Sequence, residues 1–242
     1  MFRAIRSSFL LVLLVCIACK PAPPPPKKTA SAGPQVRATV VTIRTTVDKR
    51  TIDHQLVIAD GRARFTGEND TWRLFDTKKN TVTFVDDVEK TIRTESLTAI
   101  VAKRRTTNAT TLPLELSPAR FARTSENKVL QGVNARRSVI ESGDYRRELW
   151  LAEHPAIPRG LFAMMHVSEK QSSPLAPMMG AVDAALATEP GFPLLDRATL
   201  GSDVIIERAV TAIAQRDVPE SAIVLPKRYK DVTPPVARNP QR

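Results

Sequence analysis

The chain has 242 residues, of which 42% are hydrophobic, and a formal net charge of +11 at pH 7. Both of its cysteines, Cys16 and Cys19, stand near the N-terminus, which excludes an internal disulfide and a thiolate metal site from the rest of the sequence. The folded part must therefore depend on a packed apolar core.

The N-terminus predicts export and attachment of a lipid. Residues 1–18 combine a short basic start with an apolar run that is too short to span a bilayer. The run ends in Val15-Cys16-Ile17-Ala18-Cys19, which resembles the signal of bacterial lipoproteins, where a small residue precedes the lipidated cysteine. We expect Cys19 to carry palmitate-type acyl chains. The alternative is an ordinary signal peptide without lipid, because Cys16 stands where leucine is usual.

The following residues predict a tether between this anchor and one domain. Lys20 to Gln35 reads KPAPPPPKKTASAGPQ, and so many prolines favour a stiff polyproline arm over a helix or strand. We expect residues 19–35 to form the lipidated cysteine and its tether, residues 36–232 a single domain, and residues 233–242 a flexible tail.

Periodicity within residues 36–232 predicts more strand than helix. Alternation of apolar and polar residues predicts strands over residues 41–47, 52–58, 63–65, 119–123, 135–140, 145–151 and 203–214, and a three-stranded meander over residues 71–94. Helical signals occur over residues 97–105, 162–169 and 175–188. This order of elements predicts an α+β fold with mostly antiparallel pairing.

Short motifs in this region resemble a family of bacterial lipoproteins of unknown function. The motifs are Phe75-Asp76, residues 90–94, residues 131–137, residues 148–152, residues 191–194, and Asp217-Val218-Pro219 with Pro226 and Tyr229. That family is similar in fold to the Lol-type (LolA-like) lipoprotein carriers. The resemblance implies a strongly bent antiparallel β-sheet, an unclosed half-barrel, with helices covering the concave face. It also implies a cavity but no catalytic residues. By resemblance to bacterial sorting rules, Lys20 after the cysteine favours the outer membrane, facing the periplasm, with the cell surface as the alternative.

A sheet bent in this way would line a cavity with one face of its strands. The predicted ligand-binding residues are Phe65, Trp72, Leu74, Phe84, Arg147, Leu149 and Leu151, with Ile52, Leu56 and Val82 on the same face. Arg147 could bind an anionic headgroup; the alternative is an arginine at a sheet edge in water. Met164, Met165, Met178 and Met179 would form an adaptable cover, or would be ordinary core residues.

The sequence favours binding over catalysis. It contains no nucleophile elbow, no phosphate-binding glycine loop and no His-Glu-x-x-His motif, and its three histidines are not spaced as metal ligands. Adjacent Asp86 and Asp87 fit a strand corner better than acid–base catalysis. The positive charge comes without a nucleic-acid motif, which favours anionic lipid over nucleic acid as a partner.

We therefore predict a monomeric, non-catalytic, lipid-anchored cell-envelope protein without a cofactor. Its predicted function is to bind a lipid, an acyl chain or another apolar ligand in the concave cavity. The alternative is a structural or protein-interaction module of the outer membrane whose core is filled by its own helices.

Overall fold

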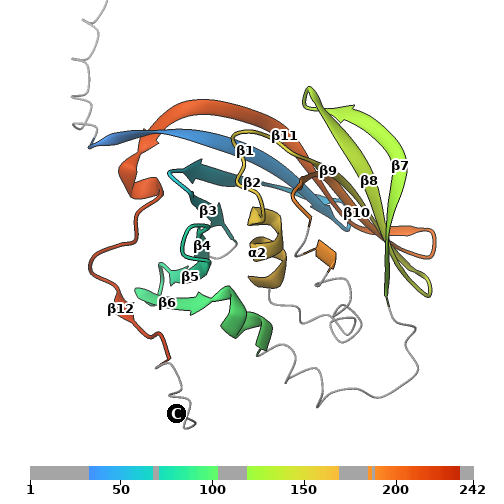
Figure 1. Cartoon of the computed structure of the whole chain (residues 1–242). Helices are drawn as coiled ribbons and strands as arrows, with labels where there is room; N and C mark the ends of the chain where they lie inside the picture. The colour runs from blue at the N-terminus through green and yellow to red at the C-terminus, as the bar shows by residue number, and fades with distance from the viewer. Residues whose placement is uncertain (1–32, 68–70, 103–118, 169–184, 187–188, 235–242) are drawn as a thin grey trace, which may run out of the picture. The chain divides into compact units, whose positions relative to one another are not determined.

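The structure is a computed structural model that describes residues 33–67, 71–102, 119–168, 185–186 and 189–234 (Figure 1). The predictions for the signal peptide, Cys19, most of the tether, Met178, Met179 and residues 235–242 lie outside the described residues.

Twelve strands form one sheet in the described part of the chain. In chain order they are β1 (Gln35–Val47), β2 (Arg50–Ala59), β3 (Arg62–Thr66), β4 (Thr71–Asp76), β5 (Thr81–Asp86), β6 (Thr91–Ser96), β7 (Arg120–Leu130), β8 (Val133–Ser142), β9 (Tyr145–Ala152), β10 (Phe192–Leu200), β11 (Asp203–Pro219) and β12 (Lys230–Asp231). Their spatial order is β12-β6-β5-β4-β3-β2-β1-β11-β10-β9-β8-β7. Only the pair β12–β6 is parallel among these strands, so the sheet is mixed, and it does not close.

Short hairpins set much of this order. Asp60-Gly61 joins β2 to β3, and Gln131-Gly132 joins β7 to β8. All four residues have positive φ angles, between 48° and 74°. Two-residue turns of this kind match the twist of antiparallel strands, and glycine adopts such angles without steric cost. Strands joined by such short turns are therefore neighbours in the sheet, whereas β6 and β7, which are consecutive in the sequence, lie far apart in it.

Helix is scarce among the described residues. The longest helix, α2 (Leu161–Ser168), has eight residues. A short helical segment covers residues 97–102, and a 3-10 helix, η2, covers Glu220–Ala222. The expected α+β fold with helices covering the concave face is therefore wrong; the fold is mostly a twelve-stranded mixed sheet.

One physical reason for this error is β10, a strand that the sequence analysis did not predict. Leu194, Asp196 and Ala198 of β10 are all buried, at 2 or 3% exposure. The charge of Asp196 interrupts the apolar alternation by which a strand is recognised. A second reason is long-range pairing, because β11 extends to Pro219 and pairs with almost all of β1.

The two faces of the sheet are covered by different elements. We call the face that carries the main core and α2 the inner face, and the opposite face the outer face. The main core includes Val41, Leu56, Phe75 and most of α2. On the outer face, residues 220–233 follow β11 and end beside β6 as β12 (Figure 1). We call this segment the C-terminal strap.

Candidate functional site on the inner face

The structure brings five of the seven predicted ligand-binding residues to the inner face. Leu149 and Leu151 belong to the main core, and Phe65 and Phe84 are half-buried against it. Arg147 precedes Leu149 on the same face of β9, at 7% exposure. Leu56 and Val82, which were expected on the same face, also belong to this core.

Trp72 and Leu74 lie elsewhere, so their predicted face is wrong. They pack with Val85 in a separate cluster, against which Leu225 and Tyr229 of the strap are placed. Phe75 takes the inner position on β4 instead. Apolar residues lie on both faces of β4, Trp72 and Leu74 on the outer face and Phe75 on the inner face, where Arg73 also lies. Alternation alone could therefore not identify the inner face.

Ile52 is a second exception. It was expected in the cavity, but it is 44% exposed near the end of the β1–β2 pair. Its position in the alternation was therefore not sufficient to predict burial.

Arg147 forms a buried ion pair rather than pointing into water. Its guanidinium donates two hydrogen bonds of 2.7 Å to the carboxylate of Asp196 on β10. Arg208 of β11 donates a third, of 3.3 Å, to the same carboxylate. The alternative of a sheet-edge position does not hold either, because β9 lies between β8 and β10. The sequence analysis missed Asp196, which stands 49 residues from its partner.

The cluster is held together electrostatically. Burial by itself would raise the pKa of Asp196, but the attraction and hydrogen bonds of Arg147, and then of Arg208, lower it below its usual value. Burial raises the pKa of the neighbouring Tyr145 hydroxyl. Asp196 therefore remains ionised near neutral pH, and its charge neutralises a buried guanidinium.

Helix α2 fills the space beside this cluster. All eight of its residues are buried, including Met164 and Met165. The ring of Phe162 meets that of Phe192 edge-on with centroids 6.4 Å apart, and Arg73 donates a hydrogen bond of 3.2 Å to the Ser168 hydroxyl. A cavity of about 50 Å³ remains, lined by side chains that include Phe65, Arg147, Met165, Asp196 and Arg208.

The remaining polar groups are dispersed. His54 packs on the ring of Phe65, His154 lies in the loop after β9, and His166 belongs to α2. No group of three histidine, cysteine, aspartate or glutamate side chains that could hold a metal ion occurs in the described residues. Within the same residues, no helix is both long and apolar enough to cross a membrane.

No family model matches the sequence, and no curated protein matches it. Among solved structures, the chain is similar to PNGF-II in its C2 and P21 crystal forms, each with a TM-score of 0.48 and 11% sequence identity. Each alignment covers 82% of this chain but only 31% or 32% of the PNGF-II chain. The chain thus spans about a third of the length of these structures.

Proposed function

We propose that this chain is a lipid-anchored, non-catalytic protein-interaction module of the cell envelope with a core filled by its own residues. The observation that supports this function best is the complete burial of α2 against the inner face of the sheet. A carrier of apolar ligands needs that space for its ligand, whereas an interaction module needs it only for stability.

The size of the inner cavity supports the same choice. Pockets for small ligands usually measure roughly 300–1,000 Å³, while the cavity beside Arg147 measures about 50 Å³. An acyl chain could enter only if α2 moved away from the sheet. The lipid of this protein is then its anchor at Cys19, and its binding activity lies on its surface.

A titration of a fluorescent fatty acid into the chain from Gly33 onward tests this function. We expect no saturable binding. The matched variants are Thr45→Phe, which places a ring in the inner cavity, and Thr46→Phe, whose side chain lies on the other face of β1. Saturable binding by the parent protein that Thr45→Phe abolishes and Thr46→Phe preserves would establish a ligand carrier instead.

A further inference from the structure

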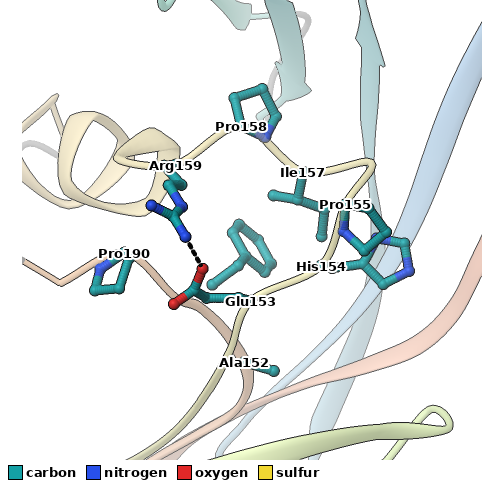
Figure 2. A pocket seen from close by; sticks show the side chains of 9 residues that line it. Ala152, Glu153, His154, Pro155, Ile157, Pro158, Arg159 and Pro190 are labelled. Atoms are coloured by element: carbon teal, nitrogen blue, oxygen red, sulfur yellow. Dashed lines mark hydrogen bonds and ion pairs between the residues drawn. The ribbon is translucent and has the colours of Figure 1, made fainter.

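The loop between β9 and α2 borders a larger cleft than the one on the inner face. Residues 153–160 form this loop, and the cleft beside it measures about 380 Å³ (Figure 2). Its lining includes Glu153, Pro155, Ile157, Pro158, Arg159 and Phe192. The volume falls within the usual range of binding pockets, roughly 300–1,000 Å³.

The walls of the cleft are preformed. Ile157 donates its backbone N–H to His154 O at 2.9 Å, and its side chain is buried in the main core. Pro155 and Pro158 fix two backbone φ angles of the same loop. Gly191 stands between the lining residues Pro190 and Phe192, and a Cβ there would lie 3.1 Å from Leu151 Cβ, so this backbone is held close to β9. Binding in this cleft would therefore require little further ordering of the protein, and its entropic cost would be small.

A second hollow borders the same loop. It measures about 320 Å³ and shares Pro155 and Pro158 with the first, and its further lining includes Arg37 and Gln215. The two hollows are therefore adjacent, and both contact the two prolines. An extended chain that passes over these prolines can occupy both.

Each hollow carries an exposed arginine in a weak ion pair. Arg159 lies 2.5 Å from Glu153, with side chains 78% and 52% exposed (Figure 2). Arg37 lies 3.5 Å from Asp217, with side chains 63% and 66% exposed. Ion pairs this exposed contribute little to stability, so a partner carboxylate can replace either acid. Without Arg3 and Arg6 of the predicted signal peptide the net charge falls from +11 to +9, and this positive charge also favours an acidic partner.

The geometry points to a groove, formed by both hollows, that binds an extended polypeptide segment of a partner protein in which acidic and apolar residues alternate. Its carboxylates would contact Arg159 and Arg37, and its apolar side chains would pack beside Pro155 and Pro158. This inference rests on the proposed function and specifies the surface and the partner of the interaction module.

The test is fluorescence anisotropy with full-length protein in a nonionic detergent and a short labelled peptide of alternating aspartate and leucine. We expect saturable binding that Arg159→Glu weakens by about fivefold or more. The matched control is Arg50→Glu, which reverses an exposed arginine at the opposite end of the β1–β2 pair and should leave binding unchanged. A peptide of lysine and leucine, measured alongside empty micelles, should not bind. Circular dichroism of both variants verifies that they fold.

Three results would overturn the inference: no saturable binding of the acidic peptide, equal weakening by Arg50→Glu, or equal binding of the lysine peptide. Hydrogen exchange gives a direct map, because added peptide should protect residues 153–160, and protection only elsewhere also excludes the groove. The fatty-acid titration of the inner cavity is independent of these results. Failure of the groove therefore leaves the interaction module in place, whereas saturable acyl binding contradicts the module itself.

Discussion

Asp196→Ala should destabilise the protein more than any surface substitution. Asp196 is 3% exposed, and its carboxylate accepts two hydrogen bonds of 2.7 Å from Arg147. Its removal leaves a buried guanidinium without its counter-charge, which costs about 3–5 kcal/mol in comparable buried pairs. Domains commonly unfold with only about 5–15 kcal/mol. The variant should therefore lose a large part of its folding free energy.

The mechanism makes a sharper prediction for the double variant Arg147→Met/Asp196→Leu. Replacing both charges removes the unpaired buried ion, and such replacements are often neutral in buried pairs. The double variant should accordingly be more stable than Asp196→Ala alone. Arg208→Gln is the control, because the Arg208 side chain is 32% exposed and its hydrogen bond to Asp196 measures 3.3 Å. It should cost about 1 kcal/mol or less.

Urea denaturation followed by circular dichroism at neutral pH measures these differences. Unchanged m-values would verify that the variants unfold from similarly compact states. A loss below about 1 kcal/mol for Asp196→Ala would refute the assignment of a desolvated ion pair. Equally, a double variant as unstable as the sum of its single changes would show that the two charges are not coupled.

Three further predictions concern pH, the strap and the anchor. Folding lowers the pKa of Asp196, so its contribution to stability is full above the ordinary pKa of about 3.9 and is lost as pH falls toward the folded value. The urea midpoint of Asp196→Ala should therefore fall less on acidification than that of the parent protein. Equal pH profiles of the two proteins would contradict this. Asp87 accepts hydrogen bonds from Trp72 Nε1 at 3.0 Å and from the Tyr229 hydroxyl at 2.7 Å. In urea denaturation, Asp87→Ala should lower the unfolding free energy by about 1–3 kcal/mol and Tyr229→Phe by about 1 kcal/mol. An unchanged unfolding free energy of Asp87→Ala would show that this contact does not hold the strap. Cys19→Ser removes the predicted acylation site and should abolish the lipid mass. Because stable attachment requires more than one acyl chain, membrane association should be lost as well. Wild-type protein without lipid mass would contradict the anchor.

Local pairing of strands could be predicted from the sequence. The meander expected over residues 71–94 corresponds to β4, β5 and β6, and the strand expected over residues 145–151 corresponds to β9. Alternation and turn residues determine such hairpins within a short stretch of chain. The helix expected over residues 162–169 likewise corresponds closely to α2.

The partners of each face could not be predicted in the same way. Trp72 and Leu74 were wrongly assigned to the inner face, because nothing in the sequence around them indicates that Tyr229, far along the chain, covers the outer face. Arg147 was correctly placed beside Leu149, but its role depends on Asp196 of another strand. Contacts between distant residues carry no periodicity, so a single sequence does not reveal them.

The wrong face of Trp72 and Leu74 and the missed partner of Arg147 bear on function, because both concern what fills the space on each side of the sheet. A half-barrel with an open inner face would offer a cavity, and Arg147 would be its natural cation. In the structure α2 occupies that face, the charge of Arg147 is neutralised by Asp196, and the strap occupies part of the other face. The proposed interaction would then use a surface whose polar groups are only weakly engaged. The exposed ion pairs of Arg159 and Arg37, in two hollows that share Pro155 and Pro158, satisfy that condition, whereas the buried pair at Arg147 does not.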